Sequence, residues 1–187
     1  MREIEVIEIT KAVIELVRRA NFLLRSDLLS ALRNAYRIEK NKRAKKILKA
    51  ILDNAAYAKN ERLAICQDTG MPVVFVEAGQ DLKINGDLKA AINKGIEAGY
   101  KKYSLRNSIV SDPLLRGGSK FSPSVIHTDI VKGKKIKLTI LPKGFGSENK
   151  SQLKMFKPTA ALEEIKKFIV EAVKSAGPDA CPPYVVG

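Results

Sequence analysis

The spacing of apolar residues changes once along this 187-residue chain, near Asn60, and no other feature constrains its fold more strongly. Before Asn60, apolar residues recur three or four positions apart, which predicts helices. After it, short β-rich runs alternate with helical patterns; the β-rich runs are 73–76, 124–131 and 136–141, and the helices are expected over 87–100 and 159–176. The pattern predicts an α+β fold in a single domain, with a helical part at residues 1–60 followed by a mixed sheet with flanking helices at 61–187.

The last two β-type runs are expected to form a hairpin. Only a short link at 132–135, rich in lysine and glycine, separates them. In the second run Ile136, Leu138 and Ile140 alternate with polar residues, so their side chains face the same side of a sheet. Two adjacent antiparallel strands are the most economical arrangement for this pattern.

The composition is strongly basic, with 34 lysines and arginines against 20 acidic residues and a net charge of +14. A positive field of this size attracts anions, which leaves nucleic acids and small carboxylates as candidate partners. A local concentration of basic residues comprises Lys40, Lys42, Arg43, Lys45, Lys46 and Lys49. Because apolar residues interleave with it at helical spacing, we interpret it as the solvated face of a helix. Nucleic-acid binding is the less supported alternative, since no recognised fold signature or aromatic stacking stripe accompanies the charge.

The sequence predicts a cytoplasmic protein without a membrane segment. No apolar run approaches the roughly 20 residues that span a bilayer, and residues 1–5 lack the apolar core of a signal peptide. The two cysteines, Cys66 and Cys181, do not indicate a disulfide scaffold.

A short segment at 64–72 combines a cysteine, an amide, a carboxylate, a hydroxyl and a glycine directly before a β-rich run. Such a density of polar groups beside a rigid element is typical of a functional loop. The alternative is a buried cysteine followed by an ordinary Asp-Thr-Gly turn. An aspartic protease is excluded, because its catalytic dyad needs two such carboxylates and the chain has one copy of the tripeptide.

Cys181 follows the last predicted helix and precedes two prolines. This setting presents a thiolate rather than burying it, and Cys-Pro recurs among iron-sulfur ligands. Two cysteines make an incomplete metal site, and His127 cannot supply the balance of a zinc site. We assign His127 no role, since a histidine in a β-type run is more often structural.

Two further features are compatible with anion binding. The glycine-rich stretch at 142–149 contains Gly144 and Gly146, whose backbone N–H groups can close on an anion, although a simple turn is the commoner case. Arg106 can pair with a carboxylate through its planar guanidinium, or be an exposed arginine near a helix end. Phosphate-loop and dinucleotide-binding spacings are absent.

Four motifs in order resemble the class I, iron-sulfur fumarate hydratases and the related L-tartrate dehydratases, specifically the alpha subunit of their two-subunit forms. The motifs are Ile65-Cys66-Gln67-Asp68-Thr69-Gly70; Val110-Ser111-Asp112-Pro113 with Ser124-Val125-Ile126-His127; Lys143-Gly144-Phe145-Gly146-Ser147-Glu148-Asn149 with Leu153-Lys154-Met155; and Ala180-Cys181-Pro182-Pro183. The resemblance covers most of the chain. One departure is the stretch at 117–123, where the family usually has Asn-Thr-Gly-Asp-Asn-Thr-Pro, so a role carried by that loop does not transfer.

The resemblance implies a 4Fe-4S cluster held by three cysteines, with one iron left open as a Lewis acid. Cys66 and Cys181 match the first two ligands. The family's third cysteine lies further downstream than Gly187, so we expect this chain to be truncated and inactive alone. The family's substrate contacts fall on Gln67, Asp68 and Arg106, with a backbone contact at Gly144 or Gly146, and Asp68 is the expected proton-handling carboxylate.

The resemblance further implies a beta subunit that completes the site in a hetero-oligomer acting on a small dicarboxylate. Reversible hydration of fumarate to malate is the expected reaction, and L-tartrate dehydration is the alternative, because every motif is common to both. A basic nucleic-acid-binding module and an inactive assembly domain are the remaining, less supported hypotheses.

Overall fold

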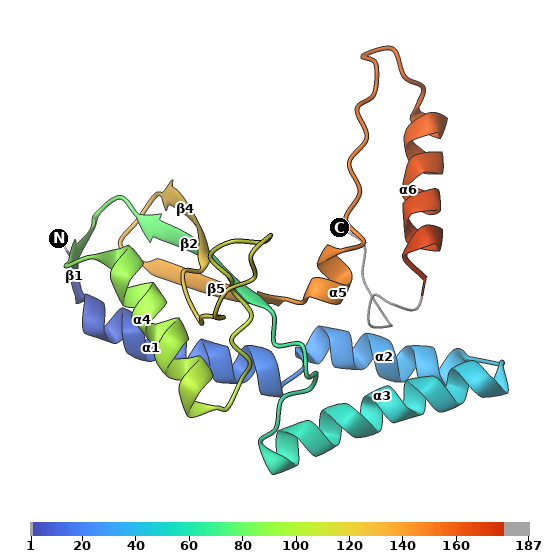
Figure 1. The fold of residues 1–187 in the computed structure, drawn as a ribbon, viewed down its shortest axis with the longest axis horizontal. Coiled ribbons are helices and arrows are strands. Elements are labelled where there is room, and N and C mark those ends of the chain that lie inside the picture. The colour runs from blue at the N-terminus through green and yellow to red at the C-terminus, as the bar shows by residue number, and fades with distance from the viewer. Residues whose placement is uncertain (1, 178–187) are drawn as a thin grey trace. The chain divides into compact units, whose positions relative to one another are not determined.

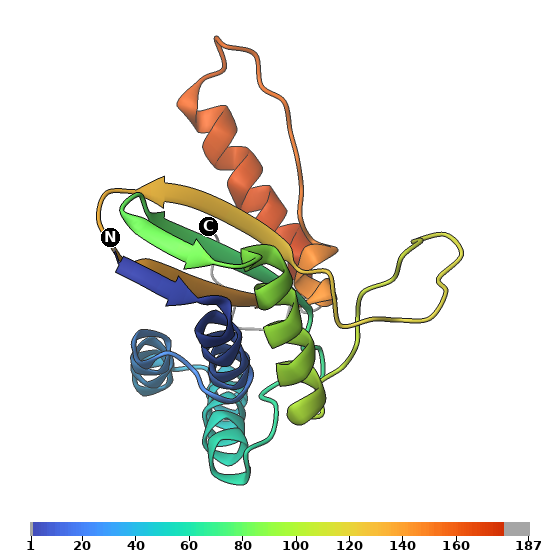
Figure 2. The same cartoon turned by 90° about the vertical axis from the view of Figure 1, so that its left-hand side faces the viewer.

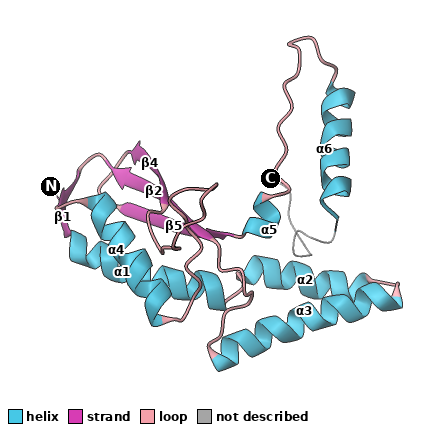
Figure 3. Cartoon of the chain, viewed as in Figure 1, coloured by secondary structure: helices cyan, strands magenta, loops and turns pink. Residues whose placement is uncertain are grey.

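The computed structural model describes residues 2–177, which fall into two compact units, residues 1–142 and residues from 143 onward (Figure 1). The first unit contains β1 (Arg2–Glu5), α1 (Val6–Phe22), α2 (Ser26–Ile38), α3 (Lys42–Glu61), β2 (Met71–Gly79), β3 (Leu82–Asn85), α4 (Leu88–Lys102) and β4 (Val125–Val131), followed by β5 (Ile136–Lys143). The second contains α5 (Phe145–Glu148) and α6 (Leu162–Ala176). After the short β1, three long helices precede a mixed sheet with flanking helices, and Figure 3 distinguishes helices from strands by colour, so the predicted α+β class is confirmed.

The core of the first unit lies between the three-stranded sheet and the helix pair α1 and α4, which Figure 2 shows on one side of the strands. Val13 and Val17 of α1 and Ile92 and Ile96 of α4 are fully buried. The β5 residues predicted to share a face, Ile136, Leu138 and Ile140, pack against this core. The residues that alternate along β5 and those spaced three or four positions apart on α1 and α4 therefore pack into one hydrophobic layer.

Two glycines allow α4 to approach α1 closely. A Cβ atom added at Gly95 would lie 2.7 Å from Val13 Cβ and 2.9 Å from the Thr10 carbonyl oxygen. At Gly99 the nearest atom would be 3.1 Å away, on Val17. The buried Thr10 hydroxyl also hydrogen bonds to the Ala91 carbonyl of α4 at 3.1 Å. Small residues on one stripe of α4 thus set the spacing of the helix pair.

The predicted hairpin is wrong, because β2 lies between β4 and β5 in the order β4-β2-β5. β2 and β4 are parallel, with Val73 opposite Val125. The Gly79 N–H donates to Lys135 O at 2.8 Å and Lys137 pairs with Glu77, so β5 runs antiparallel to β2.

The link at 132–135 passes around the end of β2. This route requires a glycine at position 79, since a Cβ there would lie 2.3 Å from Gly133 O.

A second, two-stranded sheet was not predicted. β1 and β3 pair in parallel over four residues, and Glu3 is hydrogen bonded to Lys83 and Asn85 across the pair. Both strands are short, and β1 is mostly polar, which leaves no period-two signal in the sequence.

Helices α2 and α3 pack on each other as an antiparallel pair, visible at the lower right of Figure 1. Asn41 caps α3 by accepting hydrogen bonds from the backbone N–H groups of Arg43 and Ala44. Five of the six basic residues concentrated at 40–49 are exposed, and Lys45 lies half-buried over the ring of Tyr36. The run is a solvated helix face, as its spacing predicts.

In the second unit, Phe156 packs edge-on against Phe168 of α6, with ring centroids 5.8 Å apart. α6 ends at Ala176, and the following Gly177 has a positive φ of 59°, which favours glycine. Among residues 2–177, no helix has the length and apolar character needed to cross a bilayer.

Candidate functional site

Cys66 and Asp68 line the same cleft of the first unit, which has a volume of about 900 Å³. Its walls come from the end of α1, the link to α2, the loop before β2, and β5. The polar lining residues are Arg19, Asn21, Arg25, Ser26, Asp27, Cys66, Asp68 and Thr139. The cleft lining therefore includes a thiol, two carboxylates and two guanidinium groups, and Arg25 is paired with Asp27.

Helices α1 and α3 both hydrogen bond to Ile65, near the start of the loop at 64–70. The Ile65 N–H donates to the Asn21 carbonyl at the end of α1, at 2.9 Å. The Ile65 carbonyl accepts from Asn54 Nδ2 of α3, at 2.8 Å. Cys66 and Gln67 follow directly and are exposed, while Asp68 is half-buried. Because Ile65 is tethered on both sides, the reactive side chains start from a defined backbone position.

The end of the loop is buried. Thr69 is 3% exposed, and its carbonyl accepts a hydrogen bond from the Tyr100 hydroxyl at 2.9 Å. Its own hydroxyl accepts from the Arg106 N–H at 3.0 Å. Gly70 then has a φ of 67°, in the left-handed region that favours glycine, and β2 begins at Met71. The Asp-Thr-Gly segment is thus irregular backbone that is hydrogen bonded, through Thr69, to the distant residues Tyr100 and Arg106.

Burial raises the pKa of Tyr100 from 10.0 to about 12; the neighbouring Asp68 adds to the shift and a hydrogen bond with Asn21 opposes it. Removing the proton would place a phenolate in an apolar setting against a carbonyl oxygen. Tyr100 therefore remains a hydrogen-bond donor to Thr69 throughout the physiological pH range.

The raised pKa predicts a stability change in alkaline solution. An unfolded tyrosine loses its proton near pH 10, but folded Tyr100 keeps it to about pH 12, so the free energy of unfolding falls across this window. The expected fall is roughly 2 kcal/mol. Urea denaturation at about pH 9 and about pH 11.5 should show this fall in the wild type and in Tyr57→Phe, an exposed control. Tyr100→Phe should lack it, and an equal fall in that variant would refute the assignment.

The other candidate residues that the structure describes do not line the cleft. Arg106 is exposed, and only its backbone is tied to Thr69; neither Arg106 nor Gln67 is among the residues that line the cleft. Gly144 lies just before α5 and Gly146 within it, in the second unit, so a short helix occupies part of the predicted glycine-rich turn. Cys181 lies outside the described residues. His127 is exposed and stacks on Phe75, with centroids 5.1 Å apart.

Sequence reasoning missed four residues of this region. Arg19 and Arg25 line the cleft, and Arg25 also pairs with Asp27. Asn21 and Tyr100 hold the loop. The helical pattern includes Tyr100 as an apolar position, but nothing local shows that its hydroxyl reaches a loop 31 residues away.

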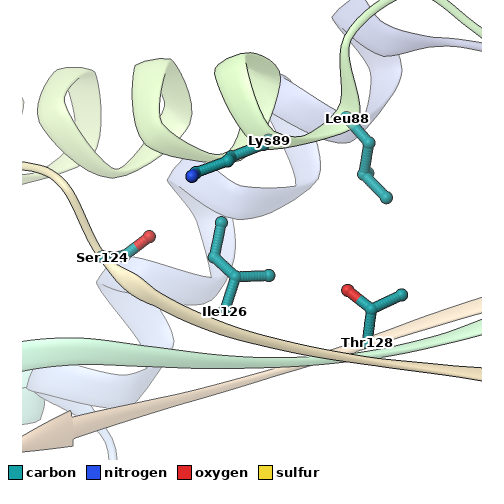
Figure 4. Close-up of a pocket in the computed structure, with 5 residues that line it drawn as sticks. All are labelled: Leu88, Lys89, Ser124, Ile126 and Thr128. Carbon is teal, nitrogen blue, oxygen red and sulfur yellow. The ribbon is translucent and has the colours of Figure 1, made fainter.

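A second cavity of about 300 Å³ lies beside the start of α4 and is lined by Leu88, Lys89, Ser124, Ile126 and Thr128 (Figure 4). The Ser124 hydroxyl and N–H both donate to Asn93 Oδ1. Asp87 caps α4 by accepting from the Ala90 N–H at 2.9 Å, which places a carboxylate at the positive helix end. The lining contains no thiol or carboxylate, and Lys89 is its one ionisable side chain.

Comparison with known proteins agrees with the motifs. A family model described as Fumarate hydratase (Fumerase) matches residues 10–187, nearly the whole chain. The chain belongs to this family. The resemblance drawn from the four motifs is confirmed at that level.

Two relatives in the fumarate hydratase family are alpha subunits by name. The chain is 37% identical over 188 residues to a Methanocaldococcus jannaschii protein named "Putative L(+)-tartrate dehydratase subunit alpha", covering 96% of this chain and 66% of that protein. It is 25% identical over 184 residues to the Escherichia coli L(+)-tartrate dehydratase subunit alpha, covering 96% and 61%. This chain therefore spans less than two thirds of these relatives' length.

A third relative is named as a fumarate hydratase. The chain is 33% identical over 141 residues to the aerobic class I fumarate hydratase of Escherichia coli, covering 71% of this chain and 25% of that protein. The similarity to tartrate dehydratase alpha subunits thus extends over more of the chain than the similarity to this fumarate hydratase.

Proposed function

We propose that this chain is the alpha subunit of an iron-sulfur hydro-lyase that removes water from L-tartrate. The observation that carries the proposal is the cleft that Cys66 and Asp68 both line, in a chain that belongs to the fumarate hydratase family. The tartrate dehydratase names of relatives aligned over 96% of the chain favour L-tartrate. Hydration of fumarate to malate, the reaction first expected from the motifs, is the second candidate, and the fumarate hydratase relatives favour it.

The donor chemistry of the loop fits a 4Fe-4S cluster. Cys66 is an exposed thiol outside any disulfide, and thiolates are the usual ligands of such clusters. Within residues 2–177 no group of three potential metal ligands occurs, and Cys66 is the one cluster ligand proposed from this part of the chain. Cys181 is the proposed second ligand. When bound, the cluster supplies an open iron that acts as a Lewis acid toward the substrate's oxygen atoms.

The chain's own residues would bind the dianion and move the proton. Arg106 and Gln67 are the proposed contacts to the substrate carboxylates, together with the backbone at Gly144 or Gly146. Asp68 is the proposed acid that protonates the leaving hydroxyl. Asp68 lines the cleft and is half-buried.

A beta subunit is the proposed partner, because the alpha-subunit relatives belong to proteins named by subunit. The groups still required around the substrate would come from that second chain in a hetero-oligomer. The basic residues at 40–49 form a solvated helix face without a recognised nucleic-acid-binding signature, so a nucleic-acid partner is not proposed.

The proposal is tested by measuring substrate preference. The full gene product is produced anaerobically with its beta-type partner, and L-tartrate dehydration is followed through oxaloacetate, with malate dehydration followed through fumarate absorbance. We expect kcat/KM for L-tartrate to exceed that for malate by at least about tenfold. The reverse preference would favour the fumarate hydratase alternative, and no turnover of either substrate would refute a hydro-lyase.

A further inference from the structure

Thr69 connects the two parts of the chain that carry the proposed site residues. It directly follows Asp68, and its hydroxyl is bonded to the backbone of Arg106, 37 residues away. The Arg106 N–H donates to Thr69 Oγ1 at 3.0 Å, and Thr69 Oγ1 lies 3.5 Å from the Arg106 carbonyl oxygen, to which it donates. The hydroxyl therefore serves both backbone groups of one residue.

The position of Thr69 is set independently of Arg106. Its carbonyl accepts from the Tyr100 hydroxyl at 2.9 Å, and Tyr100 is 1% exposed within the hydrophobic core. On its other side Gly70 turns the chain into β2. Arg106 begins a long irregular stretch that follows the buried Leu105, so its backbone lacks a helix or strand to hold it. The Thr69 hydroxyl supplies that support.

Burial distinguishes Thr69, which supports the backbone, from Asp68 and Arg106, which are proposed to contact the substrate. Thr69 is 3% exposed and has no surface for substrate, whereas Asp68 is half-buried and the Arg106 side chain is exposed. The contact requires a hydroxyl, since valine has the same shape as threonine but would leave the partly buried Arg106 N–H without this partner.

We propose that Thr69 is a positioning residue. Its hydroxyl holds the Arg106 backbone at a fixed place relative to Asp68, so that Arg106, the proposed carboxylate contact, and Asp68, the proposed proton donor, reach the same substrate. The inference rests on the proposed hydro-lyase function. Its physical basis is that reacting groups must be held within a fraction of an ångström, and small displacements cost large factors in rate.

The test compares Thr69→Val with Thr69→Ser in the enzyme assembled with its beta subunit. Thr69→Val should lower kcat/KM for the preferred dicarboxylate by roughly 10- to 100-fold, mainly through KM, because the proposed effect is on the carboxylate anchor. Thr69→Ser keeps the hydroxyl and should stay within about threefold of the wild type. Iron content and visible absorbance should be unchanged in both.

Two further readouts distinguish positioning from loss of fold. In an Arg106→Ala background, Thr69→Val should add little to the loss, since Thr69 acts through Arg106. Amide hydrogen exchange at Arg106 should accelerate in Thr69→Val and return to the wild-type rate in Thr69→Ser. Unchanged kcat/KM in Thr69→Val, additive losses, or no rescue by serine would each overturn the positioning role alone. A wild-type enzyme inactive on every substrate would overturn the proposed function, and this role with it.

Discussion

Replacing Cys66 with serine is expected to abolish both the visible absorbance of the cluster and hydro-lyase activity in the assembled enzyme. Serine keeps the size of the side chain but offers a hydroxyl in place of a thiolate, the ligand that iron-sulfur clusters require. Because Cys66 is exposed, the substitution should leave the free energy of unfolding of the cluster-free chain within about 0.5 kcal/mol of the cluster-free wild type. Iron content, absorbance and turnover are measured on anaerobically purified enzyme.

Asp68→Asn is the matched control, since it alters the same cleft two residues away. This variant should retain iron and absorbance but lose turnover by a factor of about 10² to 10⁴, as expected when a general acid is removed. If Cys66→Ser retains the cluster, Cys66 is not a ligand. If Asp68→Asn loses the cluster as well, the two roles assigned to this loop are not separable.

Gly95→Ala is expected to destabilise the chain by about 1 to 3 kcal/mol, although alanine is the better helix former. The added methyl carbon would lie within 3.0 Å of Val13 and of the Thr10 carbonyl oxygen, atoms of a packed helix that cannot move alone. Urea denaturation measures the change. Gly99→Ala, with its nearest contact at 3.1 Å, should show a smaller loss.

Gly117→Ala provides the control for chain entropy, because nothing lies within 4 Å of its added Cβ. Its stability should match the wild type within about 0.5 kcal/mol. Val13→Ala makes room for the new methyl group, so combining it with Gly95→Ala should cost less than the sum of the two single losses. A Gly95→Ala variant more stable than the wild type would show that helix propensity outweighs the overlap.

Local patterns predicted most elements of the fold, with the exception of β1, β3 and α5, but not the partners of the strands. Apolar spacing predicted α3 and α4, and alternation predicted the inward face of β5, because each depends on residues a few positions apart. The position of β2 between β4 and β5 depends instead on the crossing at Gly79, where two distant backbones come together. A hairpin and this arrangement have the same local pattern, so periodicity could not separate them.

The candidate site likewise contains residues predicted from a local motif and residues that only the tertiary structure identifies. Cys66 and Asp68 were found from the sequence because they belong to one short polar motif, and the structure places both in one cleft. Tyr100 and the cleft arginine Arg19 were not found, since each contributes through a contact between remote segments. Arg106 was found as a residue type, but its link to Thr69 was not.

The sequence by itself determined the family and the helical and mixed parts, and it supplied the candidate site residues, because these depend on motifs and on local spacing. Only the tertiary structure decided the strand order, the close approach of α1 and α4 at Gly95, and the joining of the Asp68 loop to Arg106 through Thr69. These features depend on hydrogen bonds and steric contacts between residues tens of positions apart, which no local pattern encodes.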